Sequence, residues 1–460
     1  MKKIHLIFIV LLTIGTSLNA QWYELVTPTI NYEIKSNSFI DLEINLDGDP
    51  YLLYNSVVPD EGNKLFVQKY DIENEEWSLL GGDYVNELNA SDNHLAIDSK
   101  GVVYVAFLKL GVYKRGSWCT VMKFDGTDWV QIGDWNAGII MSDVTMYCDN
   151  QDDVYVSYYD VDTYSRPIVK RYLGTESEWE TVGNSTFVEA GQCLGPALTT
   201  DNDGNVLVSF GGDNFGGGLP LNVVRFSGAE WEYVGGNGIW DEPNYPTTVI
   251  VGKNNVIHTT TTDFWSLTST VLNYQNDAWQ NQFVGIDSWY MPFAKYNDDV
   301  YMGYIDRNIN ERVKVKKVDH SGNWSDITDQ PGPYYTTPVI PRTYFDLEVD
   351  SEGNLYIAML KGDQWNNHVS VLKLDVITGI AEPQDKTITI YPNPTSGIIH
   401  INKSPGEQIQ NVLIVDVSGK LVFQQNSPPQ TLDLSDLKKG IYFIRINTSK
   451  NNYIEKLLIR

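Results

Sequence analysis

The fold is decided by residues 95–133, which contain LAIDSKGVVYVAF at 95–107 and CTVMKFDGTDWVQIG at 119–133. The first stretch holds two apolar runs around an Asp-x-x-Gly turn, a pattern typical of a β-hairpin. The second stretch alternates apolar and polar residues, turns at Asp125 and starts another strand at Trp129. Together they predict a unit of four short antiparallel strands.

This unit recurs along the chain. A Trp opens its last strand seven times, and after the first two copies the spacing is 45 to 52 residues. These residues are Trp22, Trp77, Trp129, Trp179, Trp231, Trp279 and Trp324. Seven hairpins and seven third strands accompany them, including HVSVLKL at 368–374, which no Trp follows. Such a period indicates an array of repeated structural units.

The order of the copies predicts how the array ends. WYELV at 22–26 precedes any hairpin, whereas the last hairpin and third strand, within 345–374, lack a fourth strand. The economical arrangement is a ring in which 22–26 completes the last unit. We therefore expect an all-β protein: a seven-bladed β-propeller closed by its N-terminal strand, plus a small C-terminal β-sandwich. Trp129 is then expected to pack blade against blade.

The repeat also resembles known families. The hairpins IDSKGVVYVAF at 97–107 and VDSEGNLYIAM at 349–359 resemble the NHL-type propeller repeat. The whole unit is similar to the repeats, about fifty residues long, of secreted bacterial propellers. The resemblance implies the fold and leaves the activity open.

Composition and the N-terminus restrict the partners and the location. The formal net charge of −26 disfavours nucleic acid, because phosphate binding needs clustered Lys and Arg. Lys2 and Lys3 precede a short apolar run that ends in a polar stretch at Ala20, which predicts a signal peptide at 1–20. We expect no integral membrane segment after its removal, because no later stretch is long and apolar enough to span a bilayer.

The remaining boundaries follow from the end of the repeat. We expect the propeller at 21–376, a linker around Pro383 at 377–386, and a sandwich at 387–460, where apolar and polar residues alternate between Asn, Pro, Gly and Ser turns.

The last segment contains four motifs in order: YPNPTSG at 391–397, VDVSGKLV at 415–422, LDLSDLKKGIYFIRI at 432–446 and the terminal KLLIR at 456–460. With these motifs it resembles the type A C-terminal sorting domain of the type IX secretion system of Bacteroidetes. The resemblance implies that residues 387–460 engage the type IX machinery. The protein is then expected to be secreted or displayed on the cell surface after processing of the signal peptide and the sorting domain.

The cysteines do not indicate a metal or another cofactor, and we expect none. Cys119, Cys148 and Cys193 lack the paired spacing of a zinc site. Buried thiols are the first interpretation, and a single bridge between Cys119 and Cys148 is the alternative.

A binding face is expected on one edge of the ring. Because strands alternate in direction, the short polar turns share one edge, and the long connections share the other, which we call the long-loop edge. Aromatic residues gather there, and Trp135 is expected in the loop after a fourth strand. The candidate ligand-binding residues are Trp135, Trp240, Trp265, Trp289, Trp365, Tyr334 and Tyr335.

Flat aromatic rings beside acids and amides suit a glycan, and the same mixture suits a protein partner. Noncatalytic binding of a glycan or a surface protein is therefore the first functional hypothesis. One alternative is a glycoside hydrolase or polysaccharide lyase, for which His94, Asp143 and Asp346 are catalytic candidates, because they lie near the starts of first strands that border the channel. A structural surface protein is the second alternative.

Overall fold

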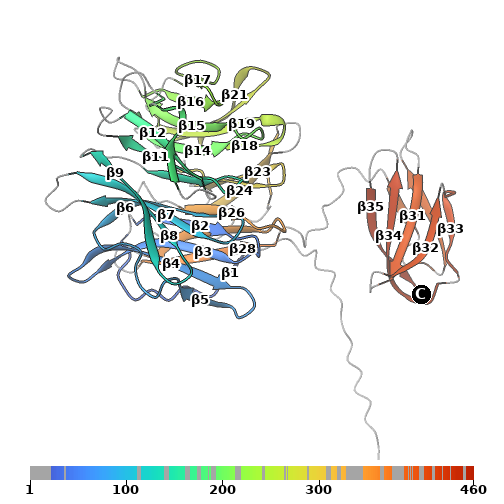
Figure 1. Ribbon diagram of the computed structural model, residues 1–460. Coiled ribbons are helices and arrows are strands. Elements are labelled where there is room, and N and C mark those ends of the chain that lie inside the picture. The colour runs from blue at the N-terminus through green and yellow to red at the C-terminus, as the bar shows by residue number, and fades with distance from the viewer. Residues whose placement is uncertain are drawn as a thin grey trace, which may run out of the picture. The chain divides into compact units, whose positions relative to one another are not determined.

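The structure is a computed structural model of the whole chain (Figure 1). The residues it describes are 22–35, 38–110, 116–138, 144–160, 166–173, 178–184, 186–187, 193–212, 219–240, 244–263, 266, 268–286, 288, 290–306, 312–318, 323–327, 345–362, 367–375, 388–391, 393, 395, 397–403, 409–416, 420–426, 428–435, 437–448 and 452–460. Contacts divide the chain into two compact units, Met1–Gly379 and Ile380–Arg460.

The described part of the first unit contains seven four-stranded antiparallel sheets. In six of them, four consecutive strands pair in chain order. The first three of these sheets are β2 (Ile40–Ile44), β3 (Pro50–Val58), β4 (Gly62–Asp71) and β5 (Glu76–Leu79); β6 (Ala90–Ile97), β7 (Val103–Leu110), β8 (Ser117–Phe124) and β9 (Trp129–Gly138); and β10 (Thr145–Cys148), β11 (Val154–Asp160), β12 (Arg166–Leu173) and β13 (Glu178–Thr181).

The next three have the same order. They are β14 (Cys193–Thr200), β15 (Val206–Gly212), β16 (Leu221–Phe226) and β17 (Trp231–Tyr233); β18 (Asn244–Val251), β19 (Ile257–Asp263), β20 (Ser269–Gln275) and β21 (Ala278–Ile286); and β22 (Phe293–Tyr296), β23 (Asp299–Asp306), β24 (Arg312–Val318) and β25 (Trp324–Asp326). Short 3₁₀ turns lie at Val182–Asn184 and Lys253–Asn255.

The seventh sheet joins the two ends of the repeat array. It consists of β26 (Phe345–Val349), β27 (Leu355–Gly362) and β28 (Asn367–Leu374), with β1 (Tyr23–Glu24) paired to β28. The Glu24 carboxylate accepts hydrogen bonds from Ser370 Oγ at 2.5 Å and from Lys361 Nζ at 3.0 Å. Backbone and side-chain bonds therefore both hold the early strand in this sheet.

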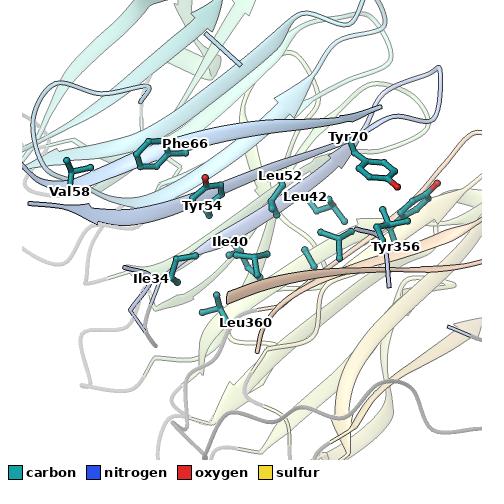
Figure 2. Packing of buried hydrophobic residues seen from close by; sticks show 14 residues of the cluster. Ile34, Ile40, Leu42, Leu52, Tyr54, Val58, Phe66, Tyr70, Tyr356 and Leu360 are labelled. Carbon is teal, nitrogen blue, oxygen red and sulfur yellow. The ribbon is translucent and has the colours of Figure 1, made fainter. Parts of the chain in front are cut away.

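The first strands of the sheets lie against one another in chain order. β2 contacts β6, and the series continues through β10, β14, β18, β22 and β26, which in turn contacts β2. The faces between sheets are filled by apolar residues. Figure 2 shows one such cluster, in which Leu42 and Leu52 of the first sheet and Tyr356 and Leu360 of β27 point into the same layer.

The Asp residues of the hairpin turns are structural. Asp98 Oδ1 accepts hydrogen bonds from the backbone N–H groups of Lys100 and Val102, each at 2.9 Å, and its Oδ2 accepts one from Tyr104 at 3.3 Å. Asp149 and Asp350 make the equivalent bonds in their own repeats. These acids cap the turns, so their recurrence reflects the fold.

The recurring Trp residues connect each sheet to the one before it. Trp179 donates its indole N–H to the Ile132 carbonyl at 2.8 Å, and Trp129 donates to the Leu80 carbonyl at 3.4 Å. Trp129 thus packs between sheets, as its repetition predicts. The same bond is made by Trp77 to Val26, Trp231 to Val182 and Trp279 to Val234. Trp324 is half-buried, and its indole nitrogen, which is buried, has no hydrogen-bond partner among the described residues.

The second unit is a β-sandwich around one apolar core. One sheet contains β29 (Ile388–Tyr391), β30 (Ile398–Lys403) and β33 (Thr431–Asp433), and the other contains β31 (Ile409–Asp416), β32 (Leu421–Asn426), β34 (Gly440–Thr448) and β35 (Asn452–Ile459). Ile399 and Ile401 of the first sheet and Ile414 and Ile444 of the second are buried in the same cluster.

None of the three cysteines is in a disulfide. The alternative of a Cys119–Cys148 bridge is therefore wrong. Cys119 is fully buried among apolar side chains, and burial raises the pKa of its thiol.

Replacing Gly81 with Ala should destabilise the first unit more than replacing Gly82. Their φ angles, +77° and +74°, lie in the left-handed region, so each Ala carries a similar backbone cost of about 1 kcal/mol. A Cβ on Gly81 would lie 2.9 Å from Trp129 Nε1, whereas nothing lies within 4 Å of one on Gly82. We expect a further loss of about 1–3 kcal/mol for Gly81→Ala from overpacking.

The measurement is urea unfolding followed by Trp fluorescence. It reports on the first unit, because the 13 tryptophans all lie at or before Trp365. In a Trp129→Ala background the difference between the two glycine variants should disappear. Equal losses in the parent protein would contradict the proposed close contact between Gly81 and Trp129.

Candidate functional site

A cavity of about 410 Å³ lies among the first strands of the sheets. Because side chains two residues apart in a strand share a face, the strands contribute two layers of side chains to it. The first layer lies four residues before the hairpin turns and consists of Asp41, His94, Thr145, Ala197, Thr248, Phe293 and Asp346. The second layer, two residues later, includes Glu43, Tyr147, Thr199, Ile250, Lys295 and Glu348.

Four carboxyl groups form one side of this cavity. Asp41 and Glu43 lie on β2, and Asp346 and Glu348 lie at the same two positions on the neighbouring strand β26. We call these four residues the acidic wall. The equivalent positions of the other strands carry hydroxyl, apolar, aromatic or basic side chains, so the cavity is acidic on one side only.

The two aspartates of the wall connect neighbouring strands. Asp346 Oδ2 accepts the Leu42 backbone N–H at 2.8 Å, which links β26 to β2. Asp41 Oδ2 accepts the Leu95 backbone N–H at 2.7 Å, which links β2 to β6. A hydrogen bond also joins the side chains of Asp346 and Asp41. The aspartates therefore have a structural role at the strand junctions.

Burial changes the acidity of the wall. It raises the pKa of Asp346, and the charge of Asp41 raises it further. Burial likewise raises the pKa values of Glu43 and Glu348, and the charges of neighbouring carboxyls raise them further. These three groups consequently retain protons at higher pH than carboxyls in water.

Two of the three catalytic candidates lie in this cavity. His94 is on β6, where its Nδ1 is 3.5 Å from Asp41 Oδ2 and its side chain is 36% exposed. Asp346 is one strand further round, on the other side of Asp41. Asp143 lies outside the described residues.

The aromatic candidates are less completely described. The expectation that Trp135 lies in a loop is wrong, because it belongs to β9 and is paired with Cys119. Its ring stacks on Tyr158 with centroids 5.6 Å apart and meets the edge of Trp179 at 4.9 Å. Trp135 is therefore half-buried within the repeat, and a role in ligand binding stays a prediction.

Trp240 is also half-buried, and its carbonyl accepts the Leu221 N–H at 2.9 Å. The other five candidates, Trp265, Trp289, Trp365, Tyr334 and Tyr335, lie outside the described residues.

Sequence reasoning missed three of the four wall residues, Asp41, Glu43 and Glu348. A signal was present: IDLEI at 40–44 and FDLEV at 345–349 share an Asp-Leu-Glu pattern at the same place in their repeats. Aligning the first and last hairpins of a closed ring would have brought the two patterns side by side. Within the described part of the chain, no group of three His, Cys, Asp or Glu side chains has the arrangement of a metal site.

Comparison with known proteins identifies the C-terminal unit. Residues 389–460 match the family model of the secretion system C-terminal sorting domain, which confirms the resemblance carried by the four motifs. The protein is therefore exported by the type IX secretion system, interacts with its machinery, and is located at the cell surface or secreted. The described residues include no helix with the length and hydropathy of a membrane span.

No curated protein sequence matches the chain. Among solved structures, the BP39L lectin from Burkholderia pseudomallei has a TM-score of 0.50 at 12% sequence identity, covering 74% of this chain and 96% of the lectin. The polysaccharide lyase Uly1 has a TM-score of 0.48 at 10% identity, covering 78% of this chain and 98% of the lyase. An α-L-arabinanase from Penicillium chrysogenum has a TM-score of 0.46 at 13% identity, covering 79% and 99%.

At 12% identity, the similarity to the lectin shows the fold alone, and that fold is a β-propeller.

Replacing Glu348 with Gln should raise the free energy of unfolding at pH 8 and leave it almost unchanged at pH 4. The folded-state pKa of Glu348 lies above the ordinary value of 4.5, so the parent protein loses stability as the pH rises through that folded pKa. Gln does not ionise and avoids this loss, for which we expect about 1–3 kcal/mol at pH 8.

Urea unfolding of the parent and the variant at both pH values measures the difference. Glu230→Gln is the control, because it removes the same charge from an exposed turn. A Glu348→Gln variant with no more stability at pH 8 than this control would contradict the raised pKa of the Glu348 carboxyl.

Proposed function

We propose that the protein is an exported seven-bladed β-propeller that binds a carbohydrate, without chemical turnover, in the cavity among its first strands. In this proposal the seven sheets are the blades and β1 closes the ring. Residues 1–20 act as the signal peptide. The expectation that the long-loop edge takes part in binding stays a prediction.

The cyclic contacts of the first strands support the ring. Each of these strands contacts the next, and β26 contacts β2, so no first strand in the described part of the unit is left at an end of the series. The pairing of β1 with β28 supports closure in the same way, because it covers an edge that an open array would expose.

The composition of the cavity carries the functional proposal. Its volume of about 410 Å³ falls in the range of small-molecule pockets, roughly 300–1,000 Å³. Hydroxyl groups of Thr145, Thr199 and Tyr147 and the carboxyls of the acidic wall can exchange hydrogen bonds with sugar hydroxyls. Phe293 also lines the cavity, and its ring packs against Trp324 and His258.

The arrangement of the aspartates favours binding over hydrolysis. A pair of glycosidase carboxyls is about 5 Å or more apart, so that substrate or water fits between them. Asp41 and Asp346 are instead hydrogen-bonded to each other, and each also accepts a backbone N–H from the next strand. Neither aspartate is therefore available as an independent acid or nucleophile.

A carbohydrate-active enzyme is the second candidate, and the glutamates favour it. The raised pKa values of Glu43 and Glu348 would let either hold a proton for a leaving group at a higher pH than an ordinary carboxyl does. A glycoside hydrolase or lyase would then use a glutamate and not the aspartates. Its product would appear in a reducing-end assay and disappear with Glu348→Gln.

A glycan array on the full chain, followed by calorimetry of the best binder, tests the proposal. Thr145→Val should weaken binding about threefold to tenfold, because it removes one hydroxyl partner from the cavity with little change in shape. Thr127→Val, in an exposed turn, is the matched control and should bind like the parent. Absence of binding across the array, equal affinity in both variants, or release of reducing ends would each contradict noncatalytic recognition in this cavity.

A further inference from the structure

His258 is the one buried histidine among those that the structure describes. It lies on β19 and is 2% exposed. His94 and His400 are half-buried, and His368 is exposed. Histidine is the side chain whose charge ordinarily changes between about pH 5 and 8, so a buried one is a point at which acid can act on a fold.

The histidine lies at the junction between the fifth sheet, β18–β21, and the sixth, β22–β25. Its Nδ1–H donates to Asn273 Oδ1 on β20 at 2.7 Å. Its ring packs edge-to-face against Trp324 of β25, with centroids 5.5 Å apart, and lies 6.5 Å from the ring of Phe293 on β22. Side chains from both sheets therefore enclose the imidazole.

Other repeats carry charged groups at the equivalent place. In the second repeat, Tyr104 lies six residues after the turn residue Asp98, donates to its carboxylate at 3.3 Å and is opposite Lys123. The Asp–Tyr bond recurs at Asp149–Tyr155 and Asp350–Tyr356. The opposite residue is a Lys or Arg in six of the seven repeats: Lys69, Lys123, Arg171, Arg225, Lys317 and Lys373.

The fifth repeat changes all three positions. Gly252 stands at the place of Asp98, because its N–H makes the same turn bond, to the Val256 carbonyl at 2.9 Å. His258 follows six residues later, and Asn273 is opposite it. A Cβ on Gly252 would lie 3.0 Å from His258 Nε2. The place where other repeats hold a carboxylate is thus beside the imidazole, and here it holds none.

The described surroundings of the ring have surplus donors. The Asn273 side chain is fully buried, and its Nδ2 has no hydrogen-bond partner; the buried Nε1 of Trp324 has none either. Protonation of His258 at Nε2 would add a third donor, because the Nδ1 proton is already given to Asn273. A buried donor without an acceptor is costly, so the neutral imidazole fits this place and the charged one does not.

Within the described part of the chain, no acid forms an ion pair with His258. Its own strand carries Asp263 at the far end, and β18, β20 and β21 contain no acidic or basic residue. The turn residue Lys253 pairs with Asp298 at 3.6 Å, and Lys295 of β22 donates to Asn202 at 3.2 Å.

The acids of the sixth sheet are each paired with a lysine: Asp299 with Lys317 at 2.6 Å, Asp306 with Lys314 at 3.0 Å and Asp326 with Lys316 at 3.0 Å. The tyrosines of the strands around the ring also have other neighbours. Tyr274 of β20 packs on Trp279, and Tyr296 of β22 belongs to the cluster between the sixth and seventh sheets. A positive charge on the ring would therefore meet no free carboxylate among these groups.

We propose that the junction between the fifth and sixth sheets is an acid-sensitive seam, which loosens when His258 is protonated. The imidazolium would be buried without an anion, so the charged form favours separation of the ring from Trp324 and Phe293. Trp324 also lacks the bond to a backbone carbonyl by which five other recurring tryptophans hold the preceding sheet. Because Phe293 lines the cavity as well, the loosening reaches the cavity wall.

The acidity of His258 gives the pH range of the seam. Burial lowers the pKa of His258 from 6.5 to about 4, although the hydrogen bond to Asn273 acts in the opposite direction. A group with a lower pKa in the folded state favours folding in its neutral form, so this contribution is present above pH 6.5 and is lost as the pH falls toward 4. Between pH 7 and pH 4.5 the closed junction should lose about fiftyfold in its equilibrium with the opened one.

The titration of His258 can be measured in the full chain without a mutation. Exchange of the imidazole C2 proton, followed by mass spectrometry over a series of pH values, reports the midpoint of each histidine. We expect the midpoint of His258 to lie well below 6.5. A midpoint near 6.5 overturns the proposal, because the charged ring would then cost the fold nothing.

Amide hydrogen exchange at pH 7 and pH 4.5, corrected for the intrinsic rates, locates the loosening. We expect β19, β20 and β24 to lose about fiftyfold more protection in acid than β15 and β16 of the fourth sheet, which contain no histidine. In His258→Gln, which keeps an amide donor for Asn273 and cannot take up a proton, the difference should disappear. The control His368→Gln changes an exposed histidine and should behave like the parent.

An equal loss of protection in all three sheets overturns the seam, and so does a difference that survives in His258→Gln. A variant with His368→Gln that loses the difference also overturns it, because the effect would then belong to another histidine. Should His258→Gln fail to fold, the C2 midpoint and the location of exchange in the parent chain still decide the proposal.

Discussion

The contact on which the first unit depends is the one between a tryptophan and the backbone of the preceding sheet. A four-stranded sheet of short strands cannot bury both of its apolar faces alone. Each face must therefore pack against a neighbouring sheet. An indole supplies a large apolar face and one donor, and both are used when Trp179 bonds to Ile132 and Trp279 to Val234. The acceptor is a backbone carbonyl of the preceding sheet. The bond therefore holds the two sheets together without depending on which side chain the acceptor residue carries.

At the opposite side of each sheet, where the first strands meet, different bonds hold the neighbours. Asp346 and Asp41 accept backbone N–H groups from the strands that follow them, so β26, β2 and β6 are linked by side chain to main chain. Elsewhere hydroxyls do this, as Thr247 does by donating to the Gly195 carbonyl at 2.6 Å. The centre of the unit thus relies on polar links that differ from repeat to repeat, in contrast to the tryptophan bond, which recurs in five repeats.

This contrast explains how far the sequence could predict the structure. The tryptophans and turn aspartates recur, so their periodicity predicts both the strand order and their structural roles. Trp135 was misplaced because the strand that opens at Trp129 was expected to end before it, whereas the structure continues β9 to Gly138, with shifts of register against β8. The acidic wall was mostly missed because a side chain found in two of seven copies is no part of a repeat. The two copies form one acidic wall because their strands, β2 and β26, are neighbours in space.

The difference between copies also separates the two kinds of acid in the wall. Asp41 and Asp346 each accept a backbone N–H group, so each of these aspartates links two neighbouring strands. Glu43 and Glu348 stand at positions where the strand ladder is already complete and where tyrosine, threonine and isoleucine serve equally well. In the described part of the chain, neither glutamate accepts a backbone N–H from a neighbouring strand, so strand pairing does not explain why both positions carry an acid. The glutamates are therefore the part of the centre that the architecture of the strands does not explain.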